Sequence, residues 1–207
     1  MTGETKVERL TVPQTREAGR VLARAFHDDP GAQYCCPDDA KRVPRLEWLF
    51  TVSVRLAHRY GGEVYTTEGT VNGGSVWLCP GNFPIGLLST VRTGMVLAPL
   101  KLGLPAFVRF MRCMTPLEHL HKDNAPARHW YLQWLGVDPP RQGQGIGSAL
   151  MQPVLARADA DGLVCYLETA NARTVPLYQR HGFEVVVEGD LPKGAPHFWT
   201  MMRAPRG

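Results

Sequence analysis

The order of apolar and polar positions predicts helices and strands in no regular order in the first half of this chain. In the last third it predicts a regular alternation of strands and helices. In the first half, the patterns predict helices at about 13–27 and 43–59 and strands at 6–12, 63–67 and 74–78. The pair Gly61-Gly62 should end the second helix. The pair Asn72-Gly73 should form the turn between the last two strands.

From residue 128 onward, strands and helices alternate, which is typical of an α/β sheet. The predicted strands cover 130–137, 163–169, 183–188 and 196–203, and the predicted helices cover 146–160 and 174–181. Because Pro153 lacks an N–H group, a bend is expected inside the first of these helices.

A long apolar stretch at 83–111 separates the two halves. Basic residues and prolines interrupt it, so it has no run of the ~20 apolar residues that a membrane span requires. We expect one or two buried helices here. The alternative is an apolar wall or lid over a binding site.

Composition narrows the class of protein only slightly. The 207 residues are 44% hydrophobic and 20% charged, as in one ordinary globular domain. The net charge is +4 without any Lys/Arg run of five, so we expect no nucleic-acid partner and attribute the charge to a phosphate-bearing cofactor. The five cysteines lack the paired spacing of a metal site, so no metal is expected. The absence of a signal-peptide pattern predicts a cytoplasmic location without a membrane partner.

The candidate chemistry lies in the loop between the strand that ends at Val137 and the helix that follows. Glycines at 143, 145 and 147 let the backbone approach a ligand, and the first turn of the helix offers unpaired N–H groups to a pyrophosphate. No Lys-Ser/Thr pair follows, so the loop is not a nucleotide P-loop. Its Gly-x-Gly-x-Gly spacing also differs from the dinucleotide fingerprint Gly-x-Gly-x-x-Gly.

Two motifs in this part of the chain resemble those of the GNAT-superfamily acetyltransferases. The first, Gln142-x-x-Gly145-x-Gly147, resembles the acyl-CoA signature of that superfamily. The second runs from Glu168 through Asn171 and Tyr178 to Phe183, with Thr174 at a position that is usually alanine. Together they cover residues 128–203. An early Ala25–Pro30 segment, Pro153, Leu167-Glu168-Thr169 and a Trp199–Met201 ending are most similar to the puromycin N-acetyltransferase group.

The resemblance implies a fold for the whole chain. We expect a single GNAT domain over 1–207, of α/β (α+β) class, with a mixed, mostly antiparallel, twisted sheet of about seven strands flanked by helices. A helical insert should lie between the third and fourth strands. The acyl-CoA-binding core would be about 128–203, with acceptor-side elements at about 13–60 and 83–123.

The resemblance also implies acetyl-CoA as the cofactor and the primary amine of a small molecule as the acceptor. The cofactor-binding residues would be Gln142, Gly143, Gln144, Gly145, Ile146, Gly147 and Ser148, with an N–H near Val137 on the acetyl carbonyl and Asn171 on the pantetheine arm. Direct attack in a ternary complex is favoured, because no Cys or Ser lies in a recognisable nucleophile motif. A homodimer is a family-level expectation.

By the same resemblance, Tyr178 would be the general acid, since a phenol of pKa near ~10 is protonated at neutral pH. Glu168 would accept the proton of the amine. Other interpretations remain open: a core tyrosine, a paired structural carboxylate and, for Asn171, a helix cap. The acceptor-side candidates, each of which could be an ordinary surface or core residue, are His27, Asp28, Asp29, Tyr34 and Trp130, with His129 as a further candidate for the base.

Alternative functions also remain open at this point. A non-catalytic acyl-CoA sensor would keep the loop and need no general acid. A protein or peptide acetyltransferase would need an open groove for its acceptor, and a structural partner protein would leave the loop empty.

Overall fold

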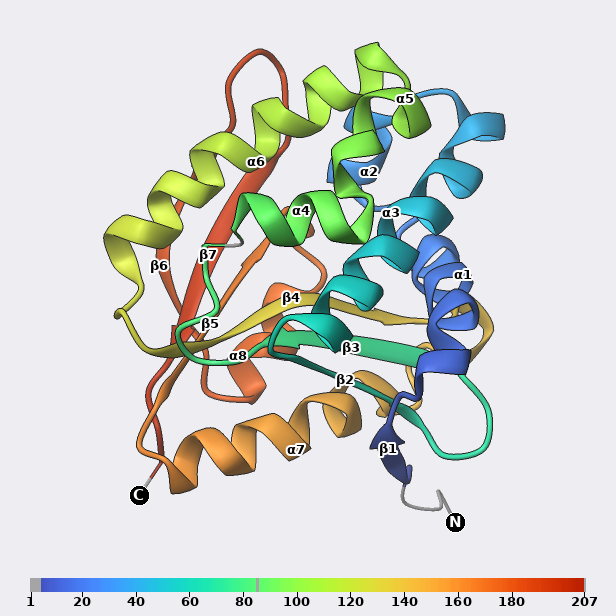
Figure 1. Ribbon diagram of the computed structural model, residues 1–207. Helices are drawn as coiled ribbons and strands as arrows, with labels where there is room; N and C mark the ends of the chain where they lie inside the picture. The colour runs from blue at the N-terminus through green and yellow to red at the C-terminus, as the bar shows by residue number, and fades with distance from the viewer. Residues whose placement is uncertain (1–4, 85, 207) are drawn as a thin grey trace.

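The computed structural model describes residues 5–84 and 86–206, and its centre is a seven-stranded sheet (Figure 1). The strand order is β1-β2-β3-β4-β5-β7-β6. The strands are β1 (Val7–Arg9), β2 (Gly62–Thr67), β3 (Gly73–Leu78), β4 (His129–Val137), β5 (Val164–Thr169), β6 (Glu184–Asp190) and β7 (His197–Arg203). Neighbouring strands pair antiparallel except β4 and β5, which run parallel. This confirms the predicted mixed, mostly antiparallel sheet.

Helices cover both faces of the sheet (Figure 1). On one face lie α7 (Ile146–Ala160) and α8 (Val175–Arg180). On the other lie α1 (Thr15–Ala25), α2 (Pro30–Cys35), α3 (Asp39–Arg59) and the insert between β3 and β4, which contains α4 (Leu87–Thr93), α5 (Ala98–Leu102) and α6 (Leu104–Asn124). Short 3₁₀ turns are η1 (Val12–Gln14), η2 (Met95–Leu97) and η3 (Pro139–Arg141). Each face therefore has its own apolar cluster, one around α1 and α3 and one around α7.

The contact between α1 and α3 shows how the apolar spacing produces the fold. Ala18, Val21 and Leu22 recur at helical spacing on α1 and are buried. They belong to the same cluster as Phe50 and Val54 of α3. Burial of each large side chain contributes roughly 1.5–3 kcal/mol. The two predicted helices are confirmed, with α3 beginning four residues earlier than expected.

Two local predictions in the first half were wrong. The strand expected at 6–12 ends at Arg9, because the Thr11 amide and hydroxyl both donate to Gln14 Oε1 at 2.8 Å and begin a helical turn instead. The turn between β2 and β3 lies around Gly69, at φ 77°, and Gly73 is inside β3. A Cβ at Gly73 would lie 2.9 Å from a main-chain oxygen of β4, so this glycine allows close strand packing.

The insert is helical, as expected, but its apolar side chains are not mainly buried. Ala98, Leu102, Ala106 and Cys113 face inward. Among the insert side chains that the structure describes, eight large apolar ones are exposed: Leu88, Val91, Val96, Leu97, Leu100, Leu104, Val108 and Met111. Within residues 5–84 and 86–206, none of the helices combines the length and the apolar character needed to span a bilayer.

The sheet opens between β4 and β5. Their ladder ends at the pair Leu132–Leu167, although β4 continues to Val137 and β5 to Thr169. Gln133 is the extra residue of a β-bulge, since β3 pairs with Leu132 and then with Trp134. The two strands therefore diverge beyond this point, and we call the space between them the β4–β5 gap.

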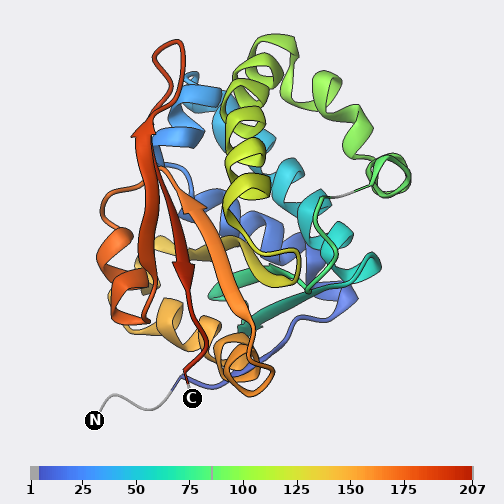
Figure 2. The same cartoon turned by 90° about the vertical axis from the view of Figure 1, so that its left-hand side faces the viewer.

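The loop between β6 and β7 extends beyond the sheet beside α2 (Figure 2). The hydroxyl of Tyr34 donates to the carbonyl of Lys193 in this loop at 3.4 Å. Elements that are far apart in the sequence thus meet at the end of the sheet where α6 also lies (Figures 1 and 2).

A buried ion pair ties α7 to β7. The two outer nitrogens of Arg203 each donate to a carboxylate oxygen of Asp159 at 2.7 Å, and Nε of Arg203 donates to the carbonyl of His181 at 2.9 Å. The Arg203 side chain is 3% exposed and that of Asp159 is 25% exposed. Removal of the carboxylate would leave a buried guanidinium without its counter-charge.

We expect Asp159→Asn to lower the free energy of unfolding by about 2 kcal/mol and the melting temperature by roughly 4–8 °C. The hydrogen bond from Arg203 holds the pKa of Asp159 below its usual value. Since the folded pKa lies below the unfolded one, the stabilisation is present above pH ~4 and is lost as pH falls through the folded pKa. In thermal melts between pH 3 and pH 7, the melting temperatures of the wild type and Asp159→Asn should therefore converge at the acid end. The control Asp161→Asn removes an exposed carboxylate two residues away, and equal melting of the two variants would contradict the prediction.

Candidate active site

The glycine loop joins the end of β4 to the start of α7. Gly143 and Gly145 adopt φ angles of 75° and 81°, a region that favours glycine. Gly145 is the N-cap of α7, and the first helical hydrogen bond runs from the Ala149 amide to the Gly145 carbonyl at 3.0 Å. The six main-chain amides of 143–148 therefore have no acceptor within the described part of the chain. Free N–H groups at the positive end of a helix dipole form an anion-binding site.

Side chains around the loop hold it against the sheet and α1. Arg24 donates two hydrogen bonds to the carboxylate of Asp138, both at 2.8 Å. The side-chain nitrogen Nε2 of Gln142 donates to the main-chain carbonyl of Val137 at 3.0 Å and so bridges the base of the loop. The first turn of α7 carries no acidic residue that would repel an anion.

The remaining loop residues divide between solvent and core. Gln144 is exposed, whereas Ile146 is buried under the helix. A Cβ at Gly147 would make ordinary van der Waals contact with α8, at 3.6 Å. The hydroxyl of Ser148 lies 2.9 Å from Nε2 of His181. Burial, followed by nearby arginines, lowers the pKa of His181, so its ring is neutral at neutral pH.

The edge of β4 that faces the gap offers further donors. The Asp138 amide donates toward β3, to the carbonyl of Asn72 at 2.8 Å. Since successive amides along a strand point to opposite sides, those of Leu135 and Val137 point away from β3 and toward the gap. The anion site and these donors thus lie on consecutive segments of the chain.

Tyr178 lies on the buried side of α8, with its ring 6.0 Å from that of Phe183. Burial raises the pKa of Tyr178, and the negative charge of Asp29 raises it further, against a smaller opposing effect of Thr174. The phenol is therefore protonated at neutral pH. The start of α2 approaches the turn before α8, since a Cβ at Gly31 would lie 3.9 Å from the Cβ of Ala170.

Asn171 shapes the turn that precedes α8. Its side-chain oxygen accepts from the Arg173 amide at 3.1 Å, and its own amide donates to the Thr169 hydroxyl at 3.1 Å. Thr174 is the N-cap of α8, and its hydroxyl donates to the Asn171 carbonyl at 2.8 Å. Asn171 thus caps a turn, while the helix itself begins after Thr174.

Glu168 lies on the opposite face of the sheet from Tyr178, one residue beyond the end of the β4–β5 ladder. Its side chain is 10% exposed, and Oε1 lies 3.3 Å from Nδ1 of His121 on α6. Tyr131 and Tyr166 lie beside His121, with ring centroids 4.4 and 4.2 Å from its own. Burial and then the charge of Glu168 raise the pKa of both phenols, so both are protonated.

Two histidines extend this group away from Glu168. Nε2 of His121 lies 2.7 Å from Nε2 of His129, and Nδ1 of His129 lies 2.6 Å from the carbonyl oxygen of Pro126. The ring of His121 is stacked between Phe83, at 3.7 Å, and Tyr166, at 4.2 Å between ring centroids. His121 is only 1% exposed, so its ring orientation is tightly held.

The acceptor-side candidates are not brought together as one group. His27 forms ion pairs with Asp28 and Asp39, at 2.8 and 3.0 Å, near the surface. Asp29 accepts from two amides of α2 as its N-cap. Trp130 lies in the core of the α7 face, away from Glu168, and Arg157 lies 5.2 Å above its ring. Tyr34, as described above, contacts the β6–β7 loop.

Sequence reasoning missed four residues of this region: His121, Gln133, Tyr131 and Tyr166. Gln133 is a polar residue within the apolar run of β4, a signal that could have identified it. Its Oε1 is buried at the β-bulge and has no partner among the residues described. His121 gave no signal, because its partners come from other elements.

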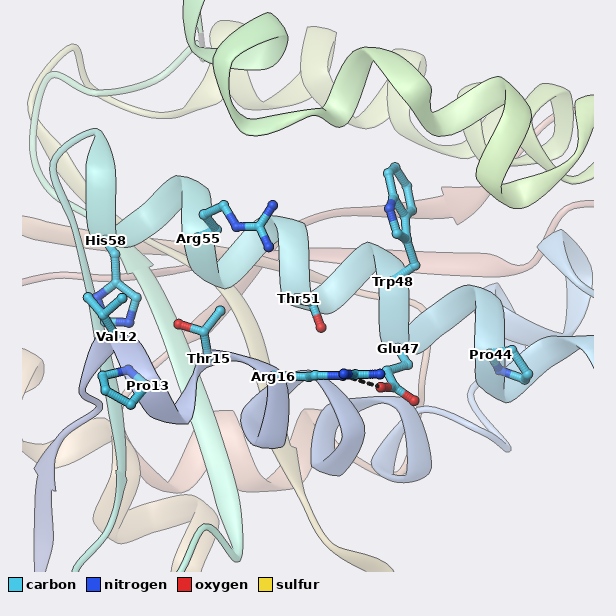
Figure 3. A pocket seen from close by; sticks show the side chains of 10 residues that line it. All are labelled: Val12, Pro13, Thr15, Arg16, Pro44, Glu47, Trp48, Thr51, Arg55 and His58. Atoms are coloured by element: carbon cyan, nitrogen blue, oxygen red, sulfur yellow. Dashed lines mark ion pairs between the residues drawn. The ribbon is translucent and has the colours of Figure 1, made fainter.

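A cavity of about 720 Å³ lies elsewhere, between α1 and α3 (Figure 3). It is open, and its lining includes Arg16 and Glu47, whose charged groups lie 3.6 Å apart. None of its lining residues belongs to the loop, the gap or the group around Glu168. Across 5–84 and 86–206, no three His, Cys, Asp or Glu side chains are grouped to hold a metal ion.

Comparisons with known proteins show similarity to acetyltransferases. The model of the acetyltransferase (GNAT) family matches residues 107–183, which include most of α6, the glycine loop and Tyr178. An uncharacterised N-acetyltransferase of Schizosaccharomyces pombe is 28% identical over 181 residues, 85% of this chain and 73% of its own length.

Two solved structures share the fold over nearly all of the chain. A histone acetyltransferase HPA2 and related acetyltransferase of Corynebacterium glutamicum has a TM-score of 0.64 and 22% identity, with 98% and 97% of the two chains covered. A polyamine N-acetyltransferase of Drosophila melanogaster, which forms N-acetylagmatine, has a TM-score of 0.63 and 15% identity, with 97% and 100% covered.

Proposed function

We propose that this chain is a GNAT-family acetyltransferase and that it transfers an acetyl group from acetyl-CoA to the primary amine of a small molecule within one ternary complex. The observation that carries the proposal is the row of six unpaired amides at 143–148. These amides would hold the pyrophosphate of the cofactor. The amides of Leu135 and Val137 would bind the rest of it along the open edge of β4.

Three groups supply the chemistry that acetyl transfer needs. An amide on the edge of β4, at or near Val137, polarises the thioester carbonyl as it becomes tetrahedral. Tyr178 donates a proton to the departing thiolate. Glu168 accepts the proton of the amine. The acid and the base lie on opposite faces of the sheet and can reach one reacting centre through the β4–β5 gap.

A small amine is supported by the surroundings of Glu168. A carboxylate among aromatic rings attracts an ammonium group and excludes bulk water. The Drosophila polyamine N-acetyltransferase, which has a similar fold, catalyses the formation of N-acetylagmatine. Membership of the puromycin N-acetyltransferase group, a homodimer and a cytoplasmic location remain predictions.

Direct attack is preferred to an acyl-enzyme because of where the hydroxyl nearest the loop lies. Ser148 is on the first turn of α7, among the amides proposed for the pyrophosphate. Its partner His181 is also outside the group around Glu168. A nucleophile there would face the phosphates rather than the thioester.

The proposal is tested by cofactor binding followed by turnover. At 100 times its dissociation constant, coenzyme A should stabilise the protein by about 2.7 kcal/mol and raise its melting temperature by roughly 5–10 °C, whereas NAD should not. Thiol release from acetyl-CoA should then be measured with puromycin-like amines, aminoglycosides and polyamines. If coenzyme A gave no thermal shift and no amine gave thiol release, the proposal would be refuted.

A further inference from the structure

We propose that Glu168 is one end of a three-residue proton relay, Glu168–His121–His129, which accepts the proton of the amine as a unit. The inference rests on the proposed function of Glu168 as the base. It assigns a role to His121, whose buried ring has no part in the chemistry described above. The three side chains come from β5, α6 and β4, so the fold alone brings them together.

The hydrogen-bond polarity of the relay is set at its far end. The carbonyl oxygen of Pro126 can only accept, so Nδ1 of His129, at 2.6 Å, carries a hydrogen. In neutral His129, Nε2 is then an acceptor. At 2.7 Å, Nε2 of His121 must donate to it. A neutral His121 that is protonated at Nε2 has a bare lone pair at Nδ1.

That nitrogen lies 3.3 Å from Oε1 of Glu168 and has no hydrogen-bond partner in the described structure. Without another proton, two electron-rich atoms would face each other in a buried site, which is unfavourable. A single added proton removes the conflict. It can lie on Glu168, on Nδ1 of His121 or, after transfer through the second ring, on His129.

The proton transfers balance at each atom. The N–H bond of the ammonium breaks as an O–H bond forms on Glu168. That proton moves to Nδ1 of His121 while the Nε2 proton of His121 moves to Nε2 of His129. The positive charge thus passes from the substrate to His129, and the amine is left neutral for attack. The relay returns its proton to solvent before the next turnover.

The surroundings favour a shared proton over separate titrations. Stacking of Phe83 and Tyr166 on the ring of His121 fixes its orientation and excludes water. Burial and then the charge of Glu168 raise the pKa of Tyr131 and Tyr166, so both nearby phenols are protonated. Glu118 on α6, whose charge also raises the pKa of Tyr131, pairs with Lys122 at 2.6 Å near the surface.

Burial, opposed by the bond to Pro126, lowers the pKa of His129, and the charge of His121 lowers it further. His129 is therefore neutral in the resting protein, which is the state that can receive a proton. Groups that interact this closely titrate together.

Nuclear magnetic resonance of the ¹⁵N-labelled imidazoles tests the relay without any substrate. Both rings, His121 and His129, should follow one common midpoint. Glu168→Gln should lower that midpoint by at least one pH unit, since an amide cannot hold the shared proton. His119, an exposed histidine two residues before His121 on α6, should keep its own midpoint throughout. Independent midpoints, or an unchanged common midpoint in Glu168→Gln, would overturn the proposal.

A kinetic test uses a residue that touches neither Glu168 nor the substrate. His129→Gln keeps an acceptor for His121 but cannot bind a proton. It should lower kcat/KM about 10-fold and move the acid limb of its pH profile downward by at least 0.5 unit, while coenzyme A binding is unchanged. His119→Gln is the matched control. An unmoved acid limb would reduce His129 to a structural role, and lack of any turnover in the wild type would instead count against the proposed function.

Discussion

Gly145→Glu should weaken the binding of coenzyme A about 100-fold, a loss of about 2.7 kcal/mol. Two physical effects combine at this position. The φ angle of 81° is strained for a residue with a Cβ, so the amides of the loop would be displaced. The new carboxylate would also face the pyrophosphate, next to amides that are arranged for a negative charge. Isothermal titration calorimetry with coenzyme A measures the loss.

The chain offers a closely matched control in Gly69→Glu. Gly69 has a φ angle of 77°, and, as at Gly145, a Cβ there would meet no atom within 4 Å. It lies in the β2–β3 turn, away from the loop. Both variants should lose similar stability, on the order of 1–2 kcal/mol, but only the loop variant should lose affinity. Wild-type affinity in Gly145→Glu would mean that the cofactor does not use these amides.

The glycine loop could be predicted from sequence because its requirements are local. A glycine at the N-cap and another at a positive φ angle leave a visible spacing, and the apolar spacing after them marks the helix. The predicted helix at 146–160 is confirmed by α7 (Ile146–Ala160). The strands that follow were likewise predicted to within two residues, because each is a short apolar run between turn residues.

The β4–β5 gap could not be predicted, because it depends on pairing between strands. The apolar run of β4 looks continuous, yet Gln133 interrupts its register with β3, and its ladder with β5 stops at Leu132. Nothing in the local pattern says where two parallel strands separate. The proposed reaction centre lies at this point of divergence.

His121 illustrates a second limit. Its helix belongs to the insert, whose apolar composition led to a prediction of burial, while residues such as Leu100 and Leu104 are exposed. The buried residue that matters is a polar one. Its neighbours Glu168 and His129 are eight or more residues away and belong to other elements, so only the folded chain brings their atoms to within 3.3 and 2.7 Å of its ring.

Tyr178→Phe should lower kcat by about 10²–10³-fold while leaving coenzyme A binding within a factor of two. The substitution removes one hydroxyl from a buried ring and keeps the packing against Phe183. Without the phenol, the thiolate would leave as an unprotonated anion in a buried site. Steady-state thiol release and calorimetry on the same preparation separate turnover from binding.

The pH dependence of the wild type distinguishes this role from that of an ordinary buried tyrosine. Burial raises the pKa of Tyr178. Since an acid is active below its pKa, the raised value should keep kcat free of an alkaline decline from this group up to about pH 10. Tyr60→Phe is the control, because it removes a buried hydroxyl that has no hydrogen-bond partner in the described structure. If both variants turned over at the wild-type rate, Tyr178 would be a core residue. If neither variant nor the wild type released thiol but all bound coenzyme A, the sensor function would be favoured, since binding would then be complete without an acid.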